Sequence, residues 1–240
     1  MRSSSPLSQV LTLGGRAPAV VGGLIVAIVA ASLLGAVAPG LVSAAALLPA
    51  MVWRGEAWRL VTWVLFEGGG PATPLNLILG GLTLFWFGRD LCYAWGPRRF
   101  LAAFFGVAAA AAAGTCVLGR LVLPGLMIGG WSGPWVAITA LIVAWSLIFP
   151  DRQILFMMTL PVSGQAMLWV TIGGTVLYAI FSGFQAYVPH LLAQLLMLGY
   201  ARGWSLRGLW QSWRIKQYER RARRRSGHLK VVKKEDRWLN

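Results

Sequence analysis

The chain has 240 residues, of which 57% are hydrophobic and only 12% are charged. Its mean hydropathy of +0.65 nearly excludes a water-soluble domain and indicates an integral membrane protein. A net charge of +15 ordinarily suggests nucleic-acid binding. However, thirteen of the 22 Lys and Arg residues lie at or beyond Arg202, after the last apolar run, where membrane proteins keep basic residues on the cytoplasmic side. The charge distribution therefore favours a lipid bilayer, and not nucleic acid, as the partner.

Apolar runs recur along the chain at lengths close to a membrane crossing. An apolar helix needs about 20 residues to cross the roughly 30 Å hydrocarbon core. The last two runs are short, which packing inside a bundle or local thinning of the bilayer would accommodate. The pattern predicts an all-α membrane protein with a bundle of six transmembrane helices. The six runs are 17–42, 75–95, 100–123, 130–149, 167–180 and 189–198.

The basic residues also predict an orientation. With six spans and a cytoplasmic N-terminus, nineteen Lys and Arg residues lie inside and only Arg54, Arg59 and Arg120 lie outside, and without the tail the ratio is still 6 to 3. No convincing cleavage site follows Arg2, so we expect the first span to be a retained anchor. This bias and the lack of a targeting segment suggest a bacterial inner membrane protein with both termini cytoplasmic. The predicted division is a cytoplasmic segment 1–16, a transmembrane domain 17–203 and a basic cytoplasmic tail 204–240.

Two segments outside the spans have compositions typical of membrane surfaces. Residues 47–73 combine tryptophans with arginines and glutamates, which suits a first loop lying at the interface. After Gly203, aromatic and leucine residues alternate with arginines. This tail is either an amphipathic helix, attracted to anionic lipids by about 1 kcal/mol per basic residue, or a solvated disordered segment. Neither interpretation assigns the tail a role in catalysis.

Histidine is scarce, which singles out one position within the membrane. The chain has only His190 and His228, and His228 lies in the basic tail. An ionisable group at membrane depth is expensive and is by default a functional hypothesis. The alternative is a histidine that only hydrogen-bonds to a neighbouring helix.

A serine flanked by glycines opens the fourth predicted span, in the run Gly130-Trp131-Ser132-Gly133. Glycines allow close approach of the backbone and leave N–H groups free to stabilise an oxyanion next to the hydroxyl. Taken alone, the same pattern is more often a turn with a capping hydroxyl. The motif therefore gains weight only from its combination with other residues.

Taken together, these residues resemble the rhomboid intramembrane serine proteases. The resemblance covers roughly residues 47–203, and the order and spacing of its parts are more specific than any single part. Its elements are the run 55–62 with Trp58-Arg59, Asn76, Phe87-Gly88, Gly96, Arg99, the run 130–133 and His190.

The resemblance implies a role for each matching residue. Ser132 corresponds to the nucleophile and His190 to the general base of a Ser-His dyad. Asn76 corresponds to a side-chain donor that assists the Ser132 N–H in stabilising the oxyanion. The remaining matches are structural: Gly130 and Gly133 permit the serine turn, and Trp58-Arg59 seats the first loop. No metal or organic cofactor is implied.

The chain also departs from the rhomboid pattern. Ala72 stands where active rhomboids usually carry a histidine, four residues before Asn76, and Glu67 replaces a second common histidine. Loss of one oxyanion donor typically slows catalysis by about 10²- to 10³-fold without abolishing it. The Glu67 carboxylate would repel an oxyanion if it pointed inward, or have no effect if it faced water. There are three smaller departures. Cys92, with Asp90 nearby, replaces the family's acidic residue after Phe-Gly, and Ala193 replaces a glycine three residues after the histidine. Val136 replaces an aromatic that often packs against the histidine ring.

Three functions are compatible with this pattern. The first is an intramembrane endopeptidase that cleaves transmembrane proteins near their outer ends. The second is a rhomboid-like pseudoprotease that binds transmembrane clients, which Ala72 and Glu67 favour and the retained Ser132 and His190 oppose. The third, a small transporter, requires a buried polar path or an internal repeat, and the sequence offers neither. The sequence favours the endopeptidase.

Overall fold

The computed structural model describes residues 18–156 and 160–202, so the predicted cytoplasmic segments 1–16 and 204–240 lie outside the described residues. The first half of the described chain contains α2 (Ala19–Val37), α3 (Pro39–Ala45), α4 (Pro49–Val52), α5 (Arg59–Thr62), α6 (Thr73–Thr83), the π-helix η1 (Leu84–Gly88) and α7 (Arg89–Trp95). The second half contains α8 (Pro97–Leu121), the 3₁₀ helix η2 (Pro124–Met127), α9 (Trp135–Ile148), β1 (Gln153–Phe156), β2 (Leu160–Ser163), α10 (Gly164–Ser182) and α11 (Phe184–Ala201).

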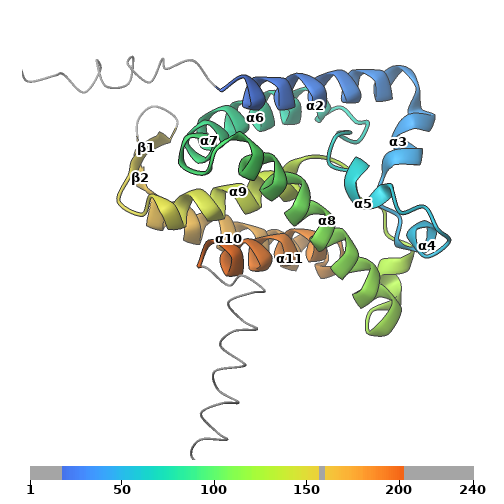
Figure 1. The fold of residues 1–240 in the computed structure, drawn as a ribbon. Helices are drawn as coiled ribbons and strands as arrows, with labels where there is room; N and C mark the ends of the chain where they lie inside the picture. Colours follow the sequence, from blue (N-terminus) through green and yellow to red (C-terminus); the bar gives the residue numbers. More distant parts are fainter. Residues whose placement is uncertain (1–17, 157–159, 203–240) are drawn as a thin grey trace, which may run out of the picture. The chain divides into compact units, whose positions relative to one another are not determined.

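The structure is mostly helical, and three of its described helices can cross a membrane by length and composition. These are α2, α8 and α10, with 19, 25 and 19 residues. The shorter α9 lies at the centre, where ten of its fourteen residues are buried. It packs against α8, α10 and α11, and against η1, α6 and α7 on another side (Figure 1). A membrane-embedded, mostly helical protein follows, with α9 as the element around which the others pack.

Each of the six predicted apolar runs overlaps helical structure, although several ends differ. The second run is an unbroken succession of α6, η1 and α7. The fifth and sixth runs are longer than predicted, since α10 has 19 residues and α11 has 18. The prediction that these two segments are short was therefore wrong. For α11 the reason is Pro189, which lies inside the helix instead of at its start.

The first predicted run is divided into two helices. The α2 helix ends at Val37 and α3 begins at Pro39. The residue before a proline is disfavoured in the helical region, and Ala38 accordingly has φ −127° and ψ 82°. The chain therefore changes direction at Ala38, and α3 leads toward the first loop.

One element departs from the all-α prediction. Strands β1 and β2 form an antiparallel hairpin between α9 and α10, with Gln153 opposite Ser163 and Phe156 opposite Leu160. Residues 157–159 of this connection lie outside the described residues. The hairpin gives the segment after Pro150 backbone hydrogen-bond partners without lengthening either helix.

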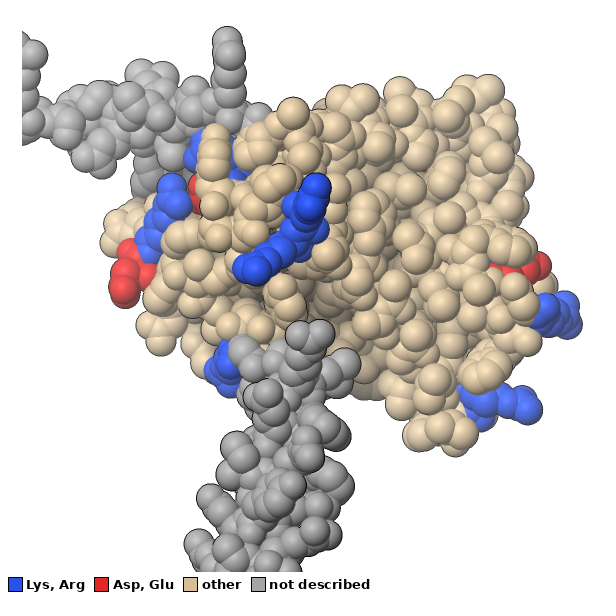
Figure 2. Space-filling view, viewed as in Figure 1, with Lys and Arg blue, Asp and Glu red and all other residues tan. Residues whose placement is uncertain are grey.

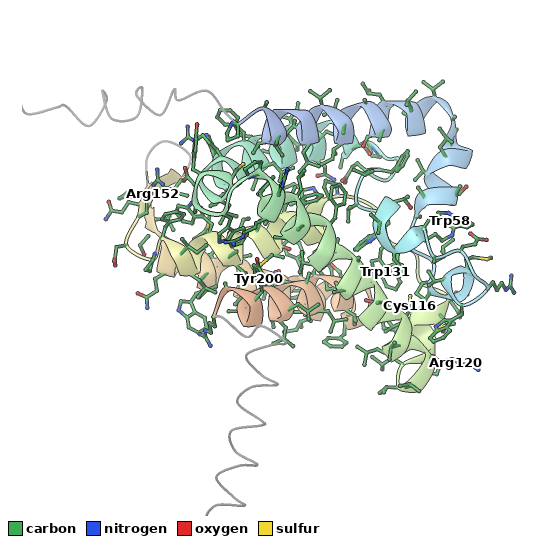
Figure 3. The ribbon with its side chains drawn as sticks, viewed as in Figure 1. Trp58, Cys116, Arg120, Trp131, Arg152 and Tyr200 are labelled. Atoms are coloured by element: carbon green, nitrogen blue, oxygen red, sulfur yellow. The ribbon has the colours of Figure 1, made fainter. Side chains whose placement is uncertain are left out.

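Charged side chains gather toward two ends of the described structure. Figure 2 shows Lys, Arg, Asp and Glu atoms from the left to the middle of the view and again at its right edge, with an uncharged surface between these two groups. Figure 3 places Arg152 toward one of these ends and Arg120 toward the other. An uncharged surface between two charged ends is the arrangement expected of a protein embedded in a bilayer.

A buried polar cluster fastens α7 and α9 to the hairpin. Asp90 Oδ2 accepts a hydrogen bond from Trp145 Nε1 at 3.0 Å and forms an ion pair with Arg152 at 2.9 Å. Trp145 is only 1% exposed, so its indole N–H depends on this carboxylate. Asp90, the acidic residue near Phe87-Gly88, therefore connects α7 with α9 and with the residue that precedes β1.

Replacement of Asp90 by alanine is expected to lower the free energy of unfolding by about 1 to 3 kcal/mol, because it leaves the buried Trp145 N–H without an acceptor. Unfolding of the purified protein in mixed detergent micelles measures the change. Exposed Asp151 provides the control, with an expected change within about 0.5 kcal/mol for Asp151→Ala. Equal stabilities of the two variants would contradict the proposed role of Asp90.

Candidate active site

The turn that carries Ser132 is held by backbone hydrogen bonds to the first loop. Leu47 N donates to Trp131 O at 2.8 Å, and Trp131 N donates to Leu47 O at 3.1 Å. Gly133 N donates to Trp63 O at 2.9 Å. The Ser132 N–H lies between these bonded groups and donates no hydrogen bond within the described residues. The turn therefore leaves a free N–H beside the Ser132 hydroxyl.

Two glycines shape this turn. Gly133 has φ +109°, in the left-handed region that favours glycine, and α9 begins two residues later. A Cβ at Gly129 would lie 2.5 Å from the Trp131 ring. Gly130 is exposed, and a Cβ there would meet only the Leu48 side chain at 3.2 Å. The backbone conformation therefore favours glycine at Gly133, and the Trp131 ring leaves little room for a side chain at Gly129, more than at the predicted Gly130.

A second contact ties the serine turn to α11, the helix of His190. Trp131, labelled in Figure 3, donates from Nε1 to Ala186 O at 2.8 Å. His190 lies one helical turn beyond Ala186. His190 Nδ1 is buried without a hydrogen-bond partner, and no bond joins His190 to Ser132 within the described residues. The serine turn and the helix of His190 are therefore in contact, but the two side chains are not hydrogen-bonded to each other.

The ring that packs on His190 comes from its own helix. Tyr187 and His190 have ring centroids 5.2 Å apart, and Tyr187 stacks on Tyr178 of α10 at 5.9 Å. The rhomboid resemblance pointed only to the position of Val136 for such an aromatic. The three-residue spacing of Tyr187 and His190 on one helix was the signal that could have identified this contact.

Glu67 connects Asn76 with the serine turn, because it contacts both. Asn76 Nδ2 donates to Glu67 Oε1 at 3.0 Å. A Cβ at Gly133 would lie 2.7 Å from Glu67 Oε2, and a Cβ at Gly68 would lie 3.0 Å from Ser132 Oγ. The segment Glu67-Gly68 therefore runs directly along Ser132-Gly133. Glu67 points inward, toward the site, and not toward water.

The environment of Glu67 is unusual for a carboxyl group. The residue is 9% exposed, its backbone N–H donates to Ser32 Oγ at 2.9 Å, and its Oε2 atom is buried without a partner. Burial raises the pKa of the Glu67 carboxyl, while the hydrogen bond from Asn76 opposes part of the rise. The neutral form therefore persists to higher pH than in an exposed glutamate.

Trp58 and Arg59 lie away from the serine and fasten the first loop. Arg59 is 6% exposed and donates to Ser43 O at 2.6 Å and Ala46 O at 2.8 Å. Its Nε atom pairs with Glu56 Oε2 at 2.6 Å. Trp58 is largely exposed and donates from Nε1 to the carbonyl of Ala44 at 3.3 Å. These bonds connect the loop to α3 and so support the segment that holds the serine turn.

An apolar pocket lies between α2 and α6 beside this site. Its lining includes Ile28 of α2, Asn76 and Gly80 of α6, and Pro134 at the start of α9. The pocket lining is thus mostly apolar but includes Asn76, which uses one of its two side-chain amide hydrogens to bond Glu67. Comparison with known proteins adds no assignment, because the chain matches no protein-family model and no curated protein.

Proposed function

We propose that this chain is a rhomboid-type intramembrane serine endopeptidase that cleaves transmembrane protein substrates with a Ser132-His190 dyad. The observation that carries the proposal is the hydrogen bond from Trp131 to Ala186, because it joins the serine turn to the helix of the only histidine among the described residues. The free Ser132 N–H and the nearby Asn76 amide add the donors that acyl transfer requires.

The proposed reaction uses these groups in sequence. His190 removes the hydroxyl proton as Ser132 Oγ attacks the substrate carbonyl carbon, and the resulting oxyanion accepts a hydrogen bond from the Ser132 N–H. One N–H of Asn76 Nδ2 stays hydrogen-bonded to Glu67 Oε1, and the second N–H is available to donate to the oxyanion. His190 then protonates the leaving amine, and water hydrolyses the acyl-enzyme.

In this proposal the six helical segments all cross the bilayer, with both termini on the cytoplasmic side of a bacterial inner membrane. The serine turn then lies toward the outer face, which would restrict cleavage to the outer end of a substrate helix. The separation of Arg120 from Arg152 agrees with this orientation (Figure 3).

Reconstitution into lipid vesicles with a transmembrane reporter substrate tests the activity. Wild type is expected to release two fragments cut near the outer membrane surface, and Ser132→Ala is expected to release none. Binding of the reporter by both proteins without cleavage by either would instead favour the pseudoprotease. Absence of both binding and cleavage over a panel of helix-destabilised reporters would argue against both functions.

Gly133→Ala is expected to slow the proposed reaction by about 10²-fold, because the new methyl group strains the turn and displaces the Glu67 carboxyl. The rate of labelling by a fluorophosphonate serine probe measures the effect. Gly130→Ala is the matched control, since its methyl group meets only a flexible leucine, and its labelling should stay within about threefold of wild type. Equal rates for the two variants would contradict the role of Gly133.

A further inference from the structure

We propose that the Glu67 carboxyl group, in its protonated form, is an oxyanion hydrogen-bond donor of this site and acts together with Asn76 and the Ser132 N–H. This inference rests on the proposed serine protease function and names a catalytic residue beyond the dyad. The geometry that supports it is the position of a buried carboxyl group against the turn of the nucleophile.

The contacts of Glu67 determine which oxygen carries the proton. Oε1 accepts the hydrogen bond from Asn76 Nδ2, so it acts as the carbonyl-type oxygen. Oε2 has no partner and faces Gly133, at 2.7 Å from the position of a Cβ there. The proton therefore belongs on Oε2, on the side of the serine turn. An O–H group without an acceptor next to Ser132 is ready to donate to an oxygen that becomes negative there.

No charge in the surroundings favours the ionised form of Glu67. The elements packed against it are α2 through Ser32, α6 through Asn76 and the serine turn through Gly133. None of α2, α6 and residues 131–134 contains an ionisable side chain, and Glu67 is the only such residue in 63–72. The ionisable groups that α11 brings toward this region are His190 and Tyr187, whose rings pack against each other. An isolated carboxylate buried in such surroundings is costly, and burial accordingly raises the pKa of Glu67.

The donor completes the proposed step without any further reagent. Ser132 Oγ forms a bond to the carbonyl carbon, the π electrons move to the carbonyl oxygen, and the hydroxyl proton moves to His190. The oxyanion then accepts hydrogen bonds from Ser132 N–H, Asn76 Nδ2 and Glu67 Oε2–H. When the intermediate collapses, the amide C–N bond breaks and the amine takes the proton from His190. Glu67 keeps its own proton throughout.

This assignment predicts the sign of the pH dependence. The reaction requires protonated Glu67, so its rate falls as the pH rises through the pKa of that carboxyl group. The rate also falls at low pH, when His190 becomes protonated and can no longer accept a proton. Wild type is therefore expected to have a bell-shaped profile whose alkaline side belongs to Glu67.

Fluorophosphonate labelling of the full-length protein in detergent, measured from pH 4 to 10, tests the assignment. In this reaction Ser132 Oγ bonds to phosphorus, fluoride leaves, and the phosphoryl oxygen occupies the oxyanion position. Glu67→Gln keeps an N–H donor but cannot titrate, so it should label within a fewfold of the wild-type maximum and lose the alkaline decline. Glu67→Ala should lower the maximal labelling rate by about 10²- to 10³-fold, with little change in the probe concentration for half-maximal rate.

A stability measurement keeps the test decisive if Glu67→Ala does not fold. Because the folded protein holds a proton that the unfolded chain releases above about pH 4.3, the Glu67 contribution to stability is lost as the pH rises toward the folded-state pKa. As the pH rises from about 4.3 toward the folded-state pKa, the free energy of unfolding of wild type should therefore decline relative to that of Glu67→Gln. A constant difference would show that the carboxyl is not held neutral and would overturn the proposal.

The outcomes separate this inference from the function on which it rests. If wild type labels no better than Ser132→Ala at every pH, the proposed protease function fails and the role of Glu67 falls with it. If wild type labels but Glu67→Ala labels equally well, only the role of Glu67 is overturned. If Glu67→Gln labels faster than wild type at every pH, the carboxylate inhibits the serine, which also overturns the donor role.

Discussion

His190→Ala is expected to lower the rate of fluorophosphonate labelling at Ser132 by about 10⁴- to 10⁶-fold, close to the background of Ser132→Ala. Without the imidazole, the ionisable side chain that the described residues place against the turn is Glu67, which the proposed donor role requires to be already protonated. Alanine also removes the ring that packs on Tyr187, so labelling is compared at equal folded fraction, measured by gel filtration.

The chain supplies a matched control for this experiment, because its second histidine, His228, lies in the basic tail. His228→Ala should label at the wild-type rate. Labelling of His190→Ala within about tenfold of wild type would remove His190 from the dyad. In that case Ser132 would have to be activated by another group, and the Trp131-Ala186 contact would have only a structural role.

Arg59→Ala is expected to cost about 3 to 5 kcal/mol of unfolding free energy, the largest stability effect that we predict. The substitution removes the ion pair with Glu56 and two hydrogen bonds to the carbonyls of Ser43 and Ala46. Because the guanidinium is 6% exposed, water does not readily replace these bonds. Unfolding in mixed detergent micelles, monitored by tryptophan fluorescence, measures the loss.

The neighbouring Arg54 is the control for charge alone. It is exposed, and its contact is a weak one with Met51 Sδ at 3.8 Å, so Arg54→Ala should change stability by less than about 0.5 kcal/mol. Arg59→Lys should recover only part of the loss, since an ammonium group cannot reproduce the fork of donors. If Arg59→Lys is as stable as wild type, the paired bonds to Ser43 and Ala46 contribute little to the stability of the fold.

Hydropathy predicted the helical segments well because burial in lipid requires long apolar runs regardless of tertiary contacts. It predicted their ends less well. The sixth run was expected to start at Pro189, yet α11 begins at Phe184 and accommodates the proline inside the helix. The break at Ala38 and the hairpin after Pro150 were also missed, since both depend on local backbone geometry that hydropathy does not report.

For the site, the sequence identified residue types but not their directions. The motif around Ser132 and the histidine in the last apolar run, His190, could be recognised from composition and spacing. Whether Glu67 faced the serine or water could not, because its position depends on contacts with Ser32, Asn76 and Gly133 from three distant parts of the chain. The structure resolves that alternative in favour of the inward orientation.

The partners that hold the serine turn are made at different times during synthesis of the chain. Its partners in the first loop, Leu47 and Trp63, precede Ser132 in the chain, whereas Ala186 and His190 follow it by more than fifty residues. A nascent chain that has been synthesised only as far as α10 therefore contains the serine and every proposed oxyanion donor but no base. If the proposed protease function holds, such a partly made molecule lacks His190 and would not cleave its neighbours until α11 is added.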